Sequence, residues 1–598
     1  MPAQQRKTPG VYITEIDANV PSIVGIETAV PAFIGYTERA VLGGKSYVGK
    51  PVRISSMVDY DAVFGGGPRA EFTFKEVTNP TDPVDIELTV GDTSKPHAVQ
   101  PPSAWYYLYS SLRLFYANGG GPCYIVSVGG YRGGVERDEL LAGLAAIQGE
   151  IGPTMLVIPD AMLLPDRAGF AKVASEMIKQ CGAVRDRVAI LDVYGSDKLP
   201  PPVMPQNTID ELIKNFRTDA GTESLKYGVA YFPSVHASLI QESDLSLANF
   251  DAKSVKLLAD TAAKMKGVDP RSPQVTTMAA IVDAATKEET AEKAEDDAAA
   301  AEDAFLANIK QLEDAAVAAK EAVNSAAEAE KAAKTAEAAA ADKALVDARE
   351  PEAALRKAAD TAHTKAKTAR AAVVYPVKPQ LQSANDGLRS GLAGLKQCYT
   401  KMASVLNILP VSGAMAGIYA QSDRTRGVWN APANISLSSV VGTTFKITGN
   451  AQDDNHVPIL GKAINAIREF VGRGPLMWGA RTLDDNSNDW RYIQVCRTMI
   501  YIEQSVQMAL DQLVFAPNDG RTWATVTAMI SNFLHGLWLQ GGLMGAKASE
   551  AFGVQCGLGT TMTGLDVLEG SMRVHITLQM LHPDEFIELN FKQQMQGV

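Results

Sequence analysis

The sequence predicts a multidomain protein that combines an α/β region, an α+β region and a long helical insertion. Three observations support this prediction. The chain has 598 residues, which is too many for one hydrophobic core. Short apolar runs alternate with helical patterns between residues 123 and 232, which favours an α/β fold. From residue 273 to 377, Ala, Glu and Lys dominate, which is typical of long helix.

Composition narrows the possible functions. The chain carries 56 Lys and Arg against 68 Asp and Glu, for a net charge of −12, and no long basic block is present. We therefore do not expect nucleic acid as the main partner. The N-terminus lacks the apolar stretch of a secretory signal, and no run of about 18 apolar residues predicts a transmembrane helix. We expect synthesis and assembly in the cytoplasm, without a signal peptide and without direct membrane insertion.

The cysteines predict buried thiols rather than a disulfide framework or a metal site. They are odd in number, widely separated and form no CxxC pair. They are Cys123, Cys181, Cys398, Cys496 and Cys556. No other pattern in the sequence predicts a metal or a cofactor, so we expect none.

Near the N-terminus the sequence predicts a strand on a long joint. In residues 9–16, Val11, Ile13 and Glu15 alternate with Tyr12, Thr14 and Ile16 after a Pro-Gly turn. The next strand, more apolar, is expected at residues 30–36. About twenty residues of extended chain span roughly 65 Å, so the first strand could reach another subunit.

The following region predicts a small β insertion and then a parallel sheet. Residues 53–90 read as short strands and turns, and residues 103–117 have helical spacing. The expected strands of the sheet are 123–128, 155–159, 188–193 and 227–232, with helices at 167–181 and 208–216 between them. Such an alternation favours a parallel sheet covered on both faces.

Two glycine-rich stretches resemble phosphate-binding loops but fit poorly. Gly43-Gly44-Lys45-Ser46 matches the end of a P-loop, but Arg39 stands where the first glycine of that motif belongs. Gly119-Gly120-Gly121 lies between a helix and a strand, whereas a dinucleotide fingerprint needs strand, glycines and helix in that order. We interpret both as connections.

The Ala-rich segment, 273–377, predicts a helical appendage with a weak coiled-coil seam. Residues three and four apart would share one face: Phe305, Ile309, Leu312, Ala316, Ala319 and Val323. Glu350-Pro351 should interrupt the helix, which favours a hairpin or a bent rod that projects from the body. A binding appendage and a solvated spacer both remain open.

The C-terminal part predicts an α+β domain. Apolar stripes indicate helices at 460–471, 495–513 and 521–537, and strands are expected at 476–483, 552–556 and 571–581. The last of these strands alternates most regularly: Met572, Val574, Ile576, Leu578 and Met580 share one face. After Pro583 a second short run follows, in which Phe586 precedes the alternating Ile587, Leu589 and Phe591. A terminal strand of this kind leaves a sheet edge for its own chain or for another.

Several motifs, read in order, resemble the tail sheath proteins of contractile phages and related contractile injection systems. They are Pro9-Gly10-Val11-Tyr12-Ile13, Thr28-Ala29-Val30-Pro31-Ala32-Phe33-Ile34-Gly35, Pro410-Val411-Ser412-Gly413, Gly427-Val428-Trp429-Asn430-Ala431-Pro432-Ala433-Asn434, Gly472-Arg473-Gly474, Trp478-Gly479-Ala480-Arg481-Thr482 and Trp490-Arg491-Tyr492-Ile493. The resemblance covers most of residues 9–270 and 400–595 and leaves out the Ala-rich insertion.

The resemblance implies a contractile sheath subunit. Many copies would form hexameric rings in a helical sheath around an inner tube protein, with baseplate and tail-terminator or cap proteins as further partners. Contraction would drive the tube through a target envelope, within a virion or an extracellular particle. The N- and C-terminal arms (Val11, Tyr12, Ile13, Glu15, Ile16, Phe586, Ile587, Leu589 and Phe591) would add as strands beside the 572–580 strand of a neighbour. Arg521 is the candidate for a residue that faces the tube.

The same resemblance implies a division of the chain. It comprises an N-terminal strand arm (1–25), part of the sheath core (26–50), a small β insertion (51–100), a central, non-catalytic subtilisin-like α/β domain (101–272 with 378–434), the helical insertion (273–377), a C-terminal sheath core domain (435–582) and a C-terminal strand arm (583–598).

Two alternatives remain. A subtilisin-like hydrolase would need a Ser nucleophile, a His base and an orienting Asp. Asp192 ends a strand and could be that acid, but no histidine or serine stands in a matching motif, and a strand-end acid is more often a cap or turn residue. We therefore predict no enzymatic activity. The other alternative is a filament or shell protein that does not contract.

Overall fold

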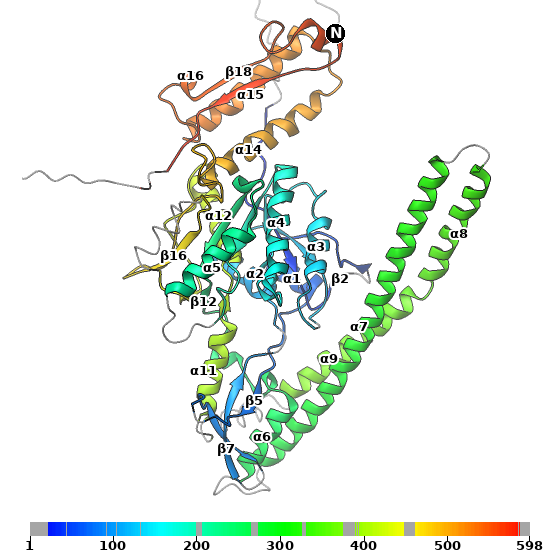
Figure 1. The fold of residues 1–598 in the computed structure, drawn as a ribbon, viewed down its shortest axis with the longest axis vertical. Coiled ribbons are helices and arrows are strands. Elements are labelled where there is room, and N and C mark those ends of the chain that lie inside the picture. The colour runs from blue at the N-terminus through cyan, green and yellow to red at the C-terminus, as the bar shows by residue number, and fades with distance from the viewer. Residues whose placement is uncertain are drawn as a thin grey trace, which may run out of the picture.

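The computed structural model describes residues 22–42, 45–79, 81–90, 93–102, 105–131, 133–198, 206–264, 273–325, 330–374, 389, 392, 394–447, 461–583 and 585. Figure 1 shows an α/β body with the last helices and strands at one end and a small β sheet at the other. A long helical hairpin projects from the second end. The expected arm residues 11–16 and 586–591 lie outside the described part of the chain.

The body is built on a nine-stranded sheet in the order β14-β17-β16-β11-β10-β9-β1-β8-β4. The strands from β8 to β16 run parallel, and β4, β17 and β14 pair antiparallel at the two edges. In chain order the sheet contains β1 (Pro31–Gly35), β4 (Val52–Ile54), β8 (Cys123–Ser127), β9 (Met155–Val157), β10 (Val188–Asp192), β11 (Gly228–Phe232), β14 (Ile435–Ser436), β16 (Asn465–Phe470) and β17 (Gly474–Trp478).

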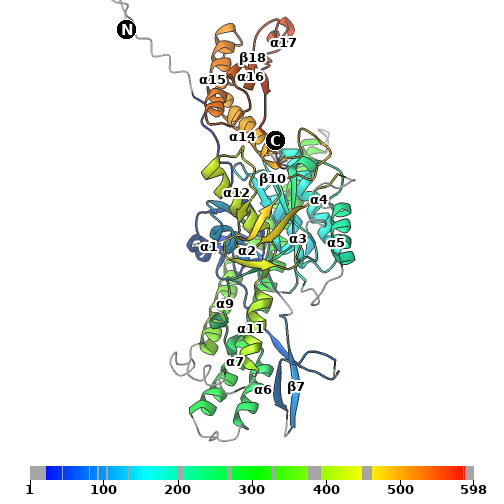
Figure 2. The same cartoon turned by 90° about the vertical axis from the view of Figure 1, so that its left-hand side faces the viewer.

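Helices cover both faces of this sheet, which confirms the α/β prediction. They are α1 (Met57–Phe64), α2 (Leu108–Ala117), α3 (Arg137–Ala146), α4 (Arg167–Val184), α5 (Gln206–Asp219) and α12 (Ser412–Arg426), with short 3-10 turns η1 (Pro159–Leu163) and η2 (Leu225–Tyr227). Figure 2 shows α1, α2 and α12 on one side and α3, α4 and α5 on the other. The strands β1, β8, β9, β10 and β11 are buried along their whole length, as their apolar runs predict.

Two predictions in the C-terminal half were wrong. The stripe at 460–471, expected as a helix, contains the strand β16, and the expected strand at 476–483 starts within β17 of the large sheet rather than in a C-terminal sheet. Ile464 and Ile467 are three residues apart and both buried. This spacing fits a helix as well as a strand that is buried on both faces, so the pattern alone could not decide.

The end opposite the C-terminal elements has its own core. The sheet β5-β7-β6 packs with helices α6 and α11 around Leu88, Phe250, Leu258 and Tyr399. Its elements are β5 (Thr73–Glu76), β6 (Ile86–Val90), β7 (Thr93–Gln100), η3 (Glu242–Asp244), η4 (Leu247–Asn249), α6 (Ala252–Ala263) and α11 (Leu395–Leu406). Two smaller sheets join β13 (Ile408–Leu409), β12 (Val235–Ala237) and β15 (Val440–Thr443), and β2 (Val41–Leu42) with β3 (Lys45–Ser46).

The Ala-rich insertion forms a helical hairpin. Helix α7 (Pro273–Ser325) packs against both α8 (Lys331–Arg349) and α9 (Glu352–Val374), which return along it. The interruption at Pro351 bends the returning side rather than reversing it. Ion pairs Lys320–Asp342 and Glu313–Arg349 set the register between α7 and α8. Ile309 and Ala316 of the predicted seam are buried.

The C-terminal elements pack on a helix that is shared with the body. Helix α14 (Ile493–Leu510) contributes Cys496 and Ile500 to the main core and Ile502 and Val506 to the C-terminal cluster. The remaining elements are η5 (Asp511–Leu513), α15 (Gly520–Leu539), α16 (Ala548–Ala551), β18 (Phe552–Gln555), α17 (Gly564–Leu568) and β19 (His575–Leu578). One helix therefore ties both regions together.

Candidate functional site

The C-terminal sheet has a free edge. Within the described residues, β19 pairs only with β18, in antiparallel register from Phe552 opposite Leu578 to Gln555 opposite His575. The predicted alternation is confirmed: Met572, Val574, Ile576, Leu578 and Met580 are partly buried, whereas the residues between them are exposed. Among the residues that the structure describes, no strand pairs with the other edge of β19.

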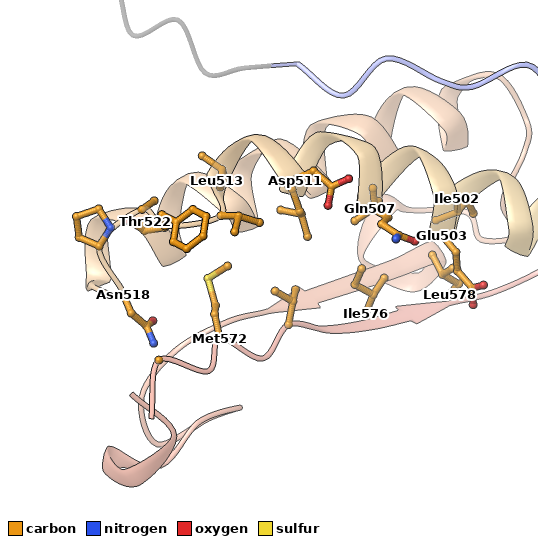
Figure 3. A pocket seen from close by; sticks show the side chains of 18 of the residues that line it. Ile502, Glu503, Gln507, Asp511, Leu513, Asn518, Thr522, Met572, Ile576 and Leu578 are labelled. Atoms are coloured by element: carbon orange, nitrogen blue, oxygen red, sulfur yellow. The ribbon is translucent and has the colours of Figure 1, made fainter. Parts of the chain in front are cut away.

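An open groove of about 730 Å³ lies between this strand and α14. Figure 3 shows Met572, Ile576 and Leu578 on one wall and Ile502, Gln507 and Asp511 on the other. The turn from Leu513 to Asn518 closes one end. The apolar face of the strand therefore points into its own domain but is only partly covered there. A groove of this kind has room for further apolar side chains.

Charge in the groove is acidic on the helix side. Glu503 and Asp511 both line it. Burial raises the pKa of Glu503, and the nearby cations Lys226 and Arg185 partly offset this rise. The groove thus combines an apolar floor with two carboxylates, and no Lys or Arg is among the described residues that line it.

Phe515 stands at the closed end of the groove in an unusual conformation. Its backbone φ is 71°, in the left-handed region, and its side chain is fully exposed at 101%. Bulky residues rarely adopt this conformation because it costs free energy. The exposed aromatic ring makes no packing contact within the described part of the chain that would offset that cost. The sequence pattern gave no sign of this residue, because neither exposure nor backbone strain has a periodic signature.

The described start of the chain runs along α14. The backbone N–H of Ile26 donates to Ser505 Oγ (3.1 Å), and the carbonyl of Thr28 accepts from Arg497 (2.9 Å). At Gly25 a Cβ would lie 2.0 Å from the hydroxyl of Tyr501, so a larger residue would force the tyrosine ring to shift. The root of the N-terminal segment is therefore fixed to the helix that forms the groove.

The C-terminal root is also fixed. Glu585, which was expected at the start of the leaving arm, forms an ion pair with the buried Arg481. Glu585 is therefore bound to a side chain of its own chain in this structure. Arg521, the predicted tube-facing residue, is exposed in the first turn of α15, where Asp519 caps the helix.

Two buried carboxylates of the body, Asp160 and Asp192, cap helices. Asp192 Oδ1 accepts from the N–H groups of Val411 (2.8 Å) and Ser412 (2.9 Å), at the start of α12. Asp160 accepts from Tyr107 (2.6 Å) and Leu108 (3.1 Å), at the start of α2. Burial raises the pKa of each carboxyl to about 6, although these hydrogen bonds lower it. The interpretation of Asp192 as a capping residue is confirmed.

Neither a hydrolase triad nor a metal site is supported. Asp192 is hydrogen-bonded to backbone N–H groups rather than to a histidine ring in the described structure. No group of three or more His, Cys, Asp or Glu able to hold a metal occurs within the described ranges. Of the five cysteines, four are buried and Cys556 is partly buried. None of the helices in the described ranges is long and apolar enough to cross a membrane.

Comparison with known proteins identifies the C-terminal region. The family of the phage tail sheath C-terminal domain matches residues 485–594. This range includes α14, β18 and β19. No curated protein sequence matches the chain.

Solved structures with the same fold come from contractile particles. One, from the anti-feeding prophage baseplate in the contracted state, is 19% identical, with a TM-score of 0.54 over 99% of this chain and 100% of the other. Another, from the contracted helical sheath of the same prophage, is 21% identical, with a TM-score of 0.51 over 98% and 100%. A third, from its six-fold symmetrised baseplate, is 21% identical, with a TM-score of 0.50 over 99% and 100%. The resemblance to tail sheath proteins is confirmed.

Proposed function

We propose that this chain is the subunit of a contractile sheath and that the groove beside β19 receives strands from neighbouring subunits. The observation that carries the proposal is the free edge of β19 above an apolar groove. It lies in the region that matches the sheath C-terminal domain family. A free edge gives a partner strand its backbone hydrogen bonds, and the groove takes alternate side chains of that strand.

The occupants we propose are the two terminal arms of other copies. Each arm contains a run of six residues, 11–16 or 586–591. As a strand, such a run would be roughly 20 Å long. The four residues of β19 offer roughly 13 Å of partner edge by the same measure. Ile587, Leu589 and Phe591 share a face that would enter the groove. The exposed Phe515 would then cover the end of the inserted strand and lose its contact with water.

Strand addition suits a sheath that changes shape. Backbone hydrogen bonds keep neighbours joined while the residues between strand and root absorb the rotation. We propose that the contracted state is lower in free energy and that baseplate and tube hold the extended state, so that firing needs no nucleotide. Hexameric rings, an inner tube near Arg521 and a terminal cap complete the proposed assembly. The subtilisin-like central domain would act as a non-catalytic scaffold, and the helical insertion would be coiled-coil-like.

Truncation tests the arms. We expect the chain without residues 1–19, and the chain without residues 586–598, to remain folded monomers that do not form tubes by electron microscopy. A matched control replaces the same residues by Gly-Ser linkers of equal length, which keeps chain length and removes the strand pattern. Normal tubes from either truncation would contradict strand exchange.

Morphology tests contraction against the filament alternative. A contractile sheath should give tubes of two lengths and two diameters, an extended form on assembled particles and a contracted form after triggering. A single fixed geometry under both conditions would leave a filament or shell protein as the better description.

A further inference from the structure

A buried arginine holds the end of the described chain. Arg481 Nε lies 3.1 Å from both carboxylate oxygens of Glu585, and its Nη2 also bonds Oε2. The hydroxyl of Tyr492 donates to the same oxygen (3.2 Å). The side chains of Arg481 and Glu585 are only 3% and 13% exposed. Both oxygens of Glu585 are thus bonded away from bulk water.

Arg481 is itself anchored to the large sheet. Its Nη1 donates to Asp485 (2.8 Å), and its backbone N–H and carbonyl bond the side-chain amide of Asn465, a residue of β16, at 2.8 Å each. Burial acts to lower the pKa of Arg481, but Glu585 and Asp485 raise it above its ordinary value. The guanidinium therefore stays charged, with a carboxylate partner on each side.

The chain reaches this anchor from the C-terminal sheet. Beyond β19, Gln579 forms backbone hydrogen bonds with Ala551 and Met544, both at 2.9 Å. The ring of His582 then lies 5.6 Å from that of Tyr492, and Glu585 follows. The last described residues thus leave the small two-stranded sheet and attach to the nine-stranded one.

We propose that Arg481 and Glu585 form an arm anchor, which passes load on the C-terminal arm to β16 instead of to the β18–β19 ladder. This inference rests on the proposed function, because the arm bears load only if residues 586–598 pair with another subunit. The ladder joins only four residues of each strand and could open from its end. A buried bidentate ion pair resists opening because separation removes one of the two carboxylates that compensate the buried guanidinium.

Hydrogen exchange on the full-length monomer tests the anchor itself. In Glu585→Gln we expect the backbone N–H groups of 579–585, of which Gln579 donates to Ala551 and Pro583 has none, to exchange at least tenfold faster. The amides of β16 and of 575–578 should stay within twofold, because Asp485 still pairs with Arg481. Arg481→Lys, which keeps the charge and loses the bidentate geometry, should act in the same direction. Glu569→Gln, an exposed glutamate of the same region, is the matched control and should change nothing. Unchanged exchange at 579–585 in Glu585→Gln would overturn the anchor.

Urea dissociation of assembled tubes separates the anchor from the arms. We expect tubes of Glu585→Gln to release subunits at lower urea than wild type, with a decrease larger than that of the unfolding midpoint of the monomer by far-UV circular dichroism. If these tubes dissociate at the wild-type concentration and truncation after Glu585 prevents assembly, the load path is wrong and strand exchange stands. If the truncated chain assembles normally, strand exchange and the load path both fail, and the exchange experiment still decides the local anchor.

Discussion

Single buried carboxylates orient the helices that cover one face of the large sheet. Asp160 and Asp192 both cap helix starts, and burial raises the pKa of each to about 6. They differ in how their two oxygens are used. Asp192 bonds both N–H groups through Oδ1, whereas Asp160 uses Oδ1 for α2 and Oδ2 for the N–H of Tyr36 (2.8 Å). Replacement by Asn therefore has different consequences at the two positions.

The residue-scale prediction concerns stability and pH. Because the folded-state pKa of about 6 lies above the ordinary value of 3.8, the folded state binds the proton more readily. The stabilisation that follows is complete below pH 3.8 and is lost as the pH rises through 6. In Asp192→Asn the amide oxygen keeps both cap bonds. We therefore expect a smaller loss of stability between pH 4 and 6, measured by urea unfolding of the monomer.

Asp160→Asn is the contrasting variant. Its amide nitrogen would face an N–H donor, either that of Tyr36 or those of α2, whichever way the amide is turned. One donor or more then stays unsatisfied, so we expect a loss of about 1–3 kcal/mol at pH 7. Equal stability of the two Asn variants at pH 7 would show that the hydrogen-bond geometry does not decide the outcome.

At the scale of elements, close helix packing accounts for glycines in the Pro410–Asn434 stretch. A Cβ on Gly413 or Gly417 would lie 2.4 Å from a backbone carbonyl oxygen of α2, that of Ser111 or Phe115. Both glycines are on one face of α12, four residues apart. Helices α2 and α12 lie side by side on the sheet. The two glycines of the motif are therefore explained by the close contact between these helices.

The element-scale prediction compares two helical glycines. Gly413→Ala should destabilise the monomer by about 1–3 kcal/mol, because a backbone carbonyl cannot move aside as a flexible side chain can. Gly536→Ala in α15, where a Cβ would meet nothing within 4 Å, should instead stabilise by up to about 1 kcal/mol through helix propensity. Calorimetry of both variants tests this. A stabilising Gly413→Ala would mean that α2 and α12 separate at little cost.

At the scale of the whole molecule, the outer part of the helical hairpin, where α8 packs against α7, extends away from the body, while the base contacts α6 and η4. The apolar residues buried in the described part of the hairpin, Ile309, Ala316, Ala338 and Ala366, belong to none of the three hydrophobic clusters that the described residues form. Figure 1 shows the hairpin extending away from the body beyond its base. Its outer half should therefore be removable.

The whole-molecule prediction concerns that outer half. Glu313 pairs with Arg349 and Lys320 with Asp342, so residues 310 and 352 lie at about the same level. Replacement of residues 310–352 by a short glycine-rich turn should leave the thermal midpoint of the body within about 1 °C. If the midpoints of all thermal unfolding transitions decreased together, the body would depend on the outer half of the hairpin for its stability. Tube formation by the shortened chain then distinguishes a spacer from a binding appendage.

Much of the architecture could be predicted from the sequence because its signals are local. Runs of apolar residues mark β8, β10 and β11, the Ala-rich composition marks the hairpin, and strict alternation marks the strand that ends in β19. The motifs pointed to the sheath family because they span most of the chain in order. β16 was missed because burial on both faces erases the alternation that tells a strand from a helix.

By itself the sequence determined which segments are strands, helices and appendage in most of the chain, since periodicity and composition act over a few residues. Only the tertiary structure decided that β16 and β17 extend the central sheet, that α14 is shared by two cores, and that Glu585 is held by Arg481. The groove beside β19 is also a feature that only the tertiary structure revealed. These features depend on contacts between residues up to several hundred positions apart, and the free energy of such contacts leaves no local pattern in the chain.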